Sequence, residues 1–507
     1  MKTISSMFGT LLGGFALLLS LSQPIESAPQ KQSAQSSRSA LIFDQDTRLD
    51  CNNLEMFIYN DGNFAYDNAN ILTKTDGLYY PRGTKKTVVY SAGIWVGAKV
   101  NGEVRLAISE YGTEFVPGPM LNGTHQPDNA SFRVYKINRN DNDATNPDYT
   151  NWPVDQGAPI DENGDPLILG DQMTWSVFND ADLSNHNIDA GSTLPLGLEI
   201  QHTGFGLNRN GPLANVYYLK YKLINKGGHN LEDAYVSIWA DPDLGDPSND
   251  LVGCDTMLSL GYCYNEGPDA TYGANPPAVG FDLFQGPIVP AEPTDSALVN
   301  GTWRHGFKNL GMTSFNKYIN GTDPANSVET YGYMRGLVKD PISGLMVPMV
   351  NPISDMVTNY AVSGNPVNQT GWIDVAAADR RLMLSAGPFN MAPGDTQEVV
   401  VAVLVGQGSS ALNSISQLFV SDYIVQSSYD ADFLFTSVSD CGDLDESGDA
   451  NLTDVMHLLN YLFAHAPAPI DPDDADVNCD GLIRITDCVY LVNYIFLGGN
   501  APCAACE

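Results

Sequence analysis

Positive charge is scarce in this sequence of 507 residues: 25 Lys and Arg stand against 60 Asp and Glu, for a formal net charge of −35. Such a balance repels nucleic acid and anionic membrane surfaces, so we expect no nucleic-acid partner. Histidine is scarce too, with seven scattered residues and no His-Glu-x-x-His motif. The sequence also lacks a Gly-x-Ser-x-Gly elbow, a phosphate loop and a dinucleotide fingerprint. These absences argue against nucleotide chemistry and the common hydrolase motifs.

Apolar runs long enough to cross a membrane are also missing. Residues 11–21 are apolar and follow Lys2, but this run is too short for a span of about 20 residues. A positive residue, an apolar run and then small residues are typical of a secretory signal, which we place at residues 1–27. Residues 28–40, rich in Gln and Ser, are expected to form a flexible leader. The mature chain is therefore predicted to be secreted, with no membrane span.

The eight cysteines fit an oxidising compartment. The spacing of Cys254 and Cys263 would allow a disulfide that closes a hairpin. Cys503 and Cys506 could pair with each other, or one of them with Cys441, and a zinc site is the alternative. The sequence leaves this connectivity open.

Residues 41–437 are predicted to form a β-rich extracellular body. Short alternating segments bounded by Gly, Pro, Asn and Asp are typical of β-sandwich sheets. Residues 87–100 end at Asn101-Gly102, a strong hairpin turn, and residues 398–405 form an apolar run typical of a buried strand. A helix is expected at residues 412–425. Two subdomains are expected, with a split near residues 245–300.

One acidic segment follows a predicted strand of the body. It offers Asp241, Asp243, Asp246, Asn249 and Asp250. Crowded carboxylate and amide oxygens suit a second calcium site, but Asp, Asn, Gly and Pro are also the residues that turns use. Both interpretations remain open.

Catalysis and sugar binding have weaker support. A glycosidase needs two carboxylates about 5 to 10 Å apart, and sixty acidic residues give too many pairs to choose one. Tryptophans could stack on sugar rings, which leaves a polysaccharide ligand possible, although a tryptophan in a sandwich is more often part of the core. The tryptophans considered are Trp152, Trp175, Trp303 and Trp372.

The most informative feature is a calcium-loop pattern that is present twice near the C-terminus, at an offset of 33 residues. Calcium takes six to eight oxygens, and a twelve-residue loop supplies them from positions 1, 3, 5, 7, 9 and 12 around a Gly. The first loop offers Asp443, Asp445, Ser447, the Asp449 carbonyl, Asn451 and Asp454; the second offers Asp476, Asn478, Asp480, the Leu482 carbonyl and Asp487. Two calcium ions are therefore predicted, although Ser447 is a weak ligand and Arg484 occupies a position that usually contributes through water.

The loops differ from a pair of EF-hands. Position 12 is Asp instead of Glu, and the segments before the loops are poor helix formers. The segments after the loops each predict one amphipathic helix, because apolar residues recur at i, i+3, i+4 and i+7. These stripes are Val455, Leu458, Leu459 and Leu462, and then Cys488, Leu491, Val492 and Ile495.

A duplicated loop-helix unit with Asp at position 12 resembles a type I dockerin over residues 441–500. The resemblance implies a small α-helical domain, here residues 438–507, that folds on calcium and binds a cohesin-like domain of another extracellular protein. In that family, loop positions 10 and 11 and the facing helix surface contact the partner. The corresponding residues are Leu452, Thr453, Asn460, Tyr461, Ile485, Thr486, Asn493 and Tyr494.

The body resembles secreted β-rich bacterial proteins with no established activity, on segments such as residues 90–97, 241–246 and 378–381. Three functions are therefore considered. The first is a non-catalytic body attached to an extracellular or cell-surface assembly through the dockerin-like module. The second is a polysaccharide-degrading enzyme carried by that module. The third is a surface structural protein in which calcium acts only as a staple.

Overall fold

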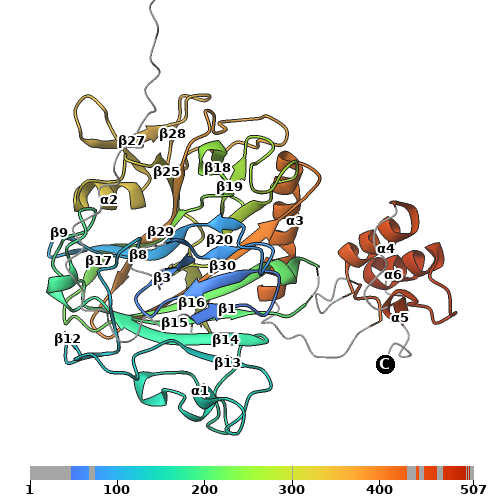
Figure 1. Ribbon diagram of the computed structural model, residues 1–507, viewed down its shortest axis with the longest axis horizontal. Helices are drawn as coiled ribbons and strands as arrows, with labels where there is room; N and C mark the ends of the chain where they lie inside the picture. Colours follow the sequence, from blue (N-terminus) through green and yellow to red (C-terminus); the bar gives the residue numbers. More distant parts are fainter. Residues whose placement is uncertain are drawn as a thin grey trace, which may run out of the picture. The chain divides into compact units, whose positions relative to one another are not determined.

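The computed structural model describes residues 47–67, 75–209, 211–299, 301–430, 441–444, 450–464, 472–497, 499–500 and 502. The predicted signal and leader lie outside these ranges. Within them, a β-rich body is followed by a small helical C-terminal unit, so the predicted fold class is confirmed (Figure 1).

The first of two large sheets has ten strands and the order β25-β29-β17-β8-β3-β2-β6-β7, with β1 paired to β2 and β9 to β8. Its strands are β1 (Thr47–Leu49), β2 (Glu55–Ile58), β3 (Asn63–Phe64), β6 (Leu78–Tyr79), β7 (Thr87–Val89), β8 (Ser91–Val100), β9 (Glu103–Ile108), β17 (Leu231–Asp241), β25 (Ser314–Ile319) and β29 (Arg380–Met391). The predicted Asn101-Gly102 turn joins β8 to β9, and both of its residues have positive φ, which is the reason for this residue pair.

The second large sheet has nine strands and the order β10-β14-β15-β16-β30-β20-β19-β18, with β13 paired to β14. Its strands are β10 (Val116–Pro117), β13 (Tyr135–Asn138), β14 (Gln172–Asn179), β15 (Leu198–Gly206), β16 (Val216–Asn225), β18 (Asp250–Asp255), β19 (Leu260–Asn265), β20 (Ala278–Gln285) and β30 (Thr396–Gly406). The apolar run at residues 398–405 lies inside β30, as predicted.

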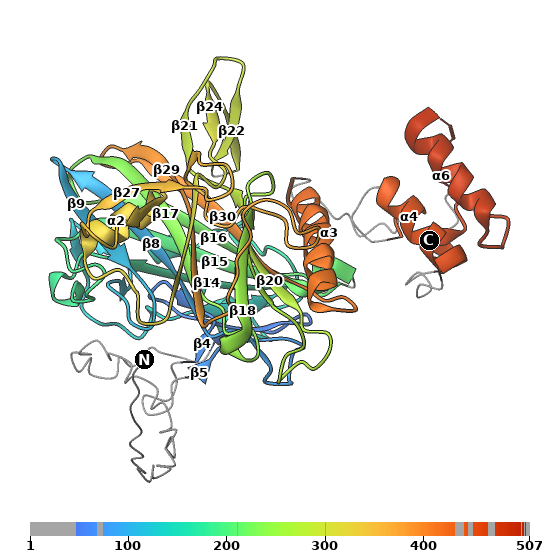
Figure 2. The same ribbon diagram turned by 90° about the horizontal axis from the view of Figure 1, so that it is seen from above.

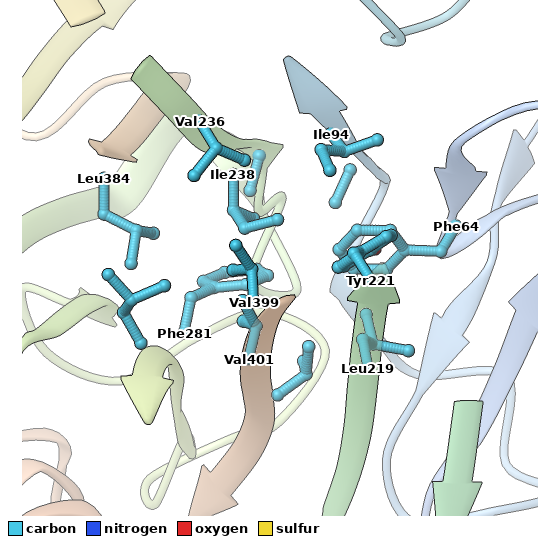
Figure 3. Packing of buried hydrophobic residues seen from close by; sticks show 14 of the residues in the cluster. Phe64, Ile94, Leu219, Tyr221, Val236, Ile238, Phe281, Leu384, Val399 and Val401 are labelled. Carbon is cyan, nitrogen blue, oxygen red and sulfur yellow. The ribbon is translucent and has the colours of Figure 1, made fainter. Parts of the chain in front are cut away.

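The two sheets pack face to face around one large core (Figure 3). Ile94, Ile238 and Leu384 from the first sheet and Tyr221 and Val401 from the second are all buried in it. Apolar residues alternate along β16, so that one of its faces enters this core, as its sequence pattern predicts.

The predicted division of the body near residues 245–300 is wrong. Strands β16 and β17 precede that region, yet they pair with β30 and β29, which follow it. Strands β18, β19 and β20 lie within the region and belong to the second sheet. The division could not be inferred from local turn signals, because long-range pairing joins both halves of the chain in each sheet.

Helices cover the outer faces of the two sheets. Helix α3 (Ala411–Asp430) is longer than predicted and packs on β30 and β20, with Ile415 and Leu418 buried (Figure 1). Helix α2 (Ser327–Met334) packs on the first sheet, where Tyr331 and Met334 join Trp95 and Trp239 in a second apolar cluster. The body is therefore a sandwich with a helix on each outer face.

The remaining elements are short. They include helix α1 (Pro147–Thr150) and four 3-10 turns: η1 (Val154–Gln156), η2 (Leu183–Asn185), η3 (Gly211–Asn215) and η4 (Pro247–Asn249). Five small sheets contain β4 (Tyr66–Asp67) and β5 (Thr75–Asp76); β11 (Met120–Leu121) and β12 (Thr124–His125); β21 (Ile288–Pro290) and β24 (Phe307–Asn309); β22 (Ser296–Val299) and β23 (Thr302–His305); and β26 (Leu337–Lys339), β27 (Met346–Val350) and β28 (Val357–Thr358).

Strands β21, β22 and β24 stand out from the sandwich (Figure 2). The neighbouring strand β23 carries Trp303, which is 65% exposed. The other tryptophans considered for sugar stacking are less available, since Trp152 and Trp175 are buried and Trp372 is packed against the core.

The predicted disulfide between Cys254 and Cys263 is not formed. Both thiols are buried and free. In the ladder between β18 and β19, Cys254 faces Gly261 and Cys263 faces Val252, so the two cysteines are diagonal and not directly opposed. Diagonal neighbours in an antiparallel pair are about 7–8 Å apart, which exceeds the reach of a disulfide. Cys441 and Cys479 each take part in a disulfide.

Candidate functional site

In the second predicted calcium loop, the carboxylates accept hydrogen bonds from the amides of the loop itself. Asp476 accepts hydrogen bonds from the amides of Asp480 and Gly481, at 3.0 and 2.7 Å. Asp487, which is fully buried, accepts one from the Arg484 amide at 2.9 Å and one from the Asn478 side-chain amide at 2.6 Å. Gly481 has a φ of 80°, which allows the turn. The loop closes where α6 (Ile485–Leu497) begins.

The described part of the first loop has the same geometry. The fully buried Asp454 accepts a 2.8 Å hydrogen bond from the Asn451 amide, and these residues correspond to Asp487 and Arg484 in the second loop. Asn451 also accepts a bond from the Thr453 amide, where α4 (Leu452–Ala464) begins. Asp443 is buried, whereas Asp445, Ser447 and Asp449 lie outside the described residues.

The two helices pack on each other as their apolar stripes predict. Val455 and Leu458 of α4 and Cys488 and Leu491 of α6 are buried in one small cluster. Before the second loop there is a single helical turn, α5 (Pro472–Ala475), in which Pro starts the turn without losing a helical hydrogen bond. This turn is much shorter than the entering helix of an EF-hand, in agreement with the prediction.

The chemistry of the second loop fits a hard cation. Burial, and then the charges of Asp476 and Asp480, raise the pKa of Asp487, so the three carboxylates are close enough to repel each other. A divalent cation among oxygen donors would remove that repulsion. Arg484 opposes this in part, because its guanidinium forms a 2.9 Å ion pair with Asp480, one of the predicted ligands.

Each of the two helices that follow the loops carries exposed apolar side chains near its start. Leu452 is 54% exposed and Ile485 is 47% exposed, at equivalent positions of α4 and α6. Met456 and Val489 are exposed one turn further along each helix. We call these four residues the apolar face. The sequence prediction missed Met456 and Val489, although their i+4 spacing from Leu452 and Ile485 was a usable signal.

The other predicted partner-binding residues are exposed or partly exposed. Asn460, Thr486, Asn493 and Tyr494 are exposed, and Thr453 and Tyr461 are partly buried.

Comparison with protein families agrees with this geometry. Residues 441–496 match the family model described as the dockerin type I domain. This segment is a type I dockerin domain. Domains of this type bind calcium in general. A comparison of the whole chain with curated proteins found no match.

The dockerin domain is carried by a chain without a membrane helix in its described part. No helix in the ranges given above is both long enough and apolar enough to cross a bilayer.

The predicted acidic segment of the body forms a cluster that differs from the predicted set. Asp241 ends β17, Asp243 follows it, and Asp379 directly precedes β29. One carboxylate oxygen from each lies within 4.8 Å of the others. Arg381 is the neighbouring cation, with its Nη1 atom 2.7 Å from Asp241 Oδ1 and in contact with Asp379. We call these three aspartates the sheet-end cluster.

Burial and mutual repulsion control the charge of the sheet-end cluster. Burial, and then the charge of Asp241, raise the pKa of Asp243 to about 10. Burial also raises the pKa of Asp241 to about 6, although Arg381 and a 2.6 Å hydrogen bond from the Tyr111 hydroxyl favour its charged form. The single guanidinium of Arg381 therefore does not balance the three carboxylates.

Asp246, Asn249 and Asp250 do not join the cluster, so the predicted set is corrected. Asp246 caps a 3-10 turn by accepting a hydrogen bond from the Ser248 amide. Asn249 accepts a hydrogen bond from Asn265 and donates one to Asp269. Asp250 accepts bonds from the Leu244 amide and from Asn265. These side chains use their hydrogen-bonding capacity within the turn and on the neighbouring residues Asn265 and Asp269. Asp379 takes their place because β17 and β29 pair, a contact that local sequence does not reveal.

Proposed function

We propose that this chain is a secreted calcium-binding protein whose dockerin domain attaches the β-rich body to an extracellular or cell-surface assembly. The partner would be a cohesin-like domain of another protein. The observation that carries this proposal is the duplicated loop-helix unit, with equivalent buried aspartates at both loop ends and an apolar face that includes residues from both helices.

The proposed calcium sites are two. Asp476, Asn478, Asp480, the Leu482 carbonyl and Asp487 would hold one ion. Asp443, Asn451 and Asp454, with Asp445, Ser447 and the Asp449 carbonyl, would hold the other. Each ion would neutralise carboxylates that otherwise repel one another, and so link formation of the loop to the start of its helix.

The proposed partner surface is the apolar face with its polar surroundings. Large exposed apolar side chains on two neighbouring helices favour a partner patch that is itself apolar. Thr453, Asn460, Tyr461, Thr486, Asn493 and Tyr494 would supply hydrogen bonds around it.

Capture of the full chain by immobilised cohesin domains, in calcium and in chelator, tests the proposal. We expect calcium-dependent capture that is lost in Leu452→Ser/Ile485→Ser. Val420→Ser is a matched control, because Val420 is 54% exposed on α3 and lies outside the dockerin domain. No capture by any cohesin in calcium would contradict the proposal and leave calcium as a structural staple.

A non-catalytic body is part of the same proposal. A panel of soluble and insoluble polysaccharides tests this part with the full chain. Release of reducing ends that a single Asp or Glu substitution abolishes would overturn it in favour of a glycoside hydrolase.

A further inference from the structure

A second type of cation site is suggested by carboxylate oxygens of the body that have no hydrogen-bond donor. Asp241 is only 1% exposed, and its Oδ1 atom accepts no hydrogen bond. The Oδ1 atom of Asp243 is also buried and accepts none. A buried carboxylate oxygen without a donor is costly, because it has lost its water without a replacement.

Arg381 does not satisfy these oxygens. Its Nη1 atom lies 2.7 Å from Asp241 Oδ1, but it donates its hydrogen bonds to Asp379 and to the Arg380 carbonyl. The contact with Asp241 is therefore an ion pair without a hydrogen bond. Tyr111 donates to the other oxygen of Asp241. Among the described residues outside the cluster, none donates a hydrogen bond to Asp241 Oδ1.

The composition of the cluster selects the class of ligand. When all three carboxylates are ionised, they outnumber the one guanidinium and leave an excess of negative charge. One divalent cation would balance this excess. All the converging atoms are oxygens, which suit calcium or magnesium better than zinc or copper. Calcium tolerates irregular geometry, whereas magnesium demands a near-ideal octahedron.

We propose that Asp241, Asp243 and Asp379 bind one calcium ion at this end of the first sheet, separately from the dockerin loops. The ion would tie the segment after β17 to the residue before β29, two neighbouring strands of the sandwich. The body would then gain stability from calcium even when the dockerin domain cannot bind it.

The test uses the full chain with both dockerin loops disabled by Asp443→Ala and Asp476→Ala. All six tryptophans precede residue 441, so tryptophan fluorescence during thermal unfolding reports the body alone. We expect calcium to raise this melting temperature, and equilibrium dialysis to find about one bound ion per chain. Magnesium serves as the second ion and is expected to have a weaker effect.

Asp243→Asn and Asp379→Asn, added to this background, should abolish both the bound ion and the melting shift. Asp246→Asn is the matched control and should retain the ion. If the double variant does not fold, Asp243→Asn alone is decisive. Absence of calcium binding in the loop-disabled parent, or its retention in Asp243→Asn, would overturn the proposal.

Discussion

Asp487 accepts a 2.9 Å hydrogen bond from the backbone amide of Arg484 and is fully buried at the start of α6. Asp454 does the same with Asn451 at the start of α4. The last predicted ligand of each loop is therefore also a cap of the helix that follows. Without a cation, these buried carboxylates would lie close to other acidic groups, so we expect calcium binding to be coupled to folding of the dockerin domain.

The first prediction concerns this coupling. Asp443→Ala/Asp476→Ala in the full chain should make residues 441–500 sensitive to limited proteolysis at millimolar calcium, as the wild-type protein should be in chelator. The reason is that both loops lose their first ligand and cannot bind the ions that stabilise them. Protection by calcium that persists in this variant would contradict the prediction.

The second prediction concerns the apolar face. Leu452→Ala and Ile485→Ala should each weaken cohesin binding by about 1 kcal/mol, roughly fivefold in Kd, because each half-exposed side chain has only part of its surface left to bury. Titration calorimetry in calcium measures the loss. Equal losses for the two variants would mean that the partner contacts both helices to a similar extent. Val420→Ala is the control and should leave the affinity unchanged.

The third prediction concerns pH. Asp282 of β20 and Asp422 of α3 are both buried, and their carboxyl groups are close enough for each to affect the pKa of the other. Burial, and then the charge of Asp422, raise the pKa of Asp282, and burial raises the pKa of Asp422 to about 7. Asp255 and Asp430 add negative charge nearby. In the unfolded chain both groups ionise near pH 4.

Raised folded-state pKa values mean that stability is complete below about pH 4 and is lost as pH rises through about 7. Asp422→Asn should therefore raise the melting temperature at pH 8 by a few degrees and flatten its fall between pH 5 and 8. Asp355→Asn, at an exposed position, is the control and should preserve the slope. An unchanged slope in Asp422→Asn would contradict the prediction.

The fourth prediction concerns the thiols. Cys254 and Cys263 are buried and free, and burial raises the pKa of both, so neither should react in the native protein. Alkylation in denaturant without reductant should label both, and peptide mass spectrometry locates the labels. Labelling that requires prior reduction would show that the two cysteines are oxidised after all.

Much of the body could be predicted from local pattern. The β16 alternation, the Asn101-Gly102 turn, the β30 strand and most of α3 follow from residue spacing that acts over a few neighbours. The single sandwich, the free thiols and the position of Asp379 could not be predicted, because they depend on which distant strands pair and in which register.

The sequence by itself determined the dockerin domain, because the predicted ligands of each loop lie within twelve consecutive residues. The helix after each loop is likewise encoded by the residues that directly follow it. Only the tertiary structure decided the composition of the sheet-end cluster. Asp241 and Asp379 are remote along the chain and meet because β17 and β29 are hydrogen-bonded neighbours. Local ligand spacing is visible in a sequence, whereas a site assembled by strand pairing has no local pattern.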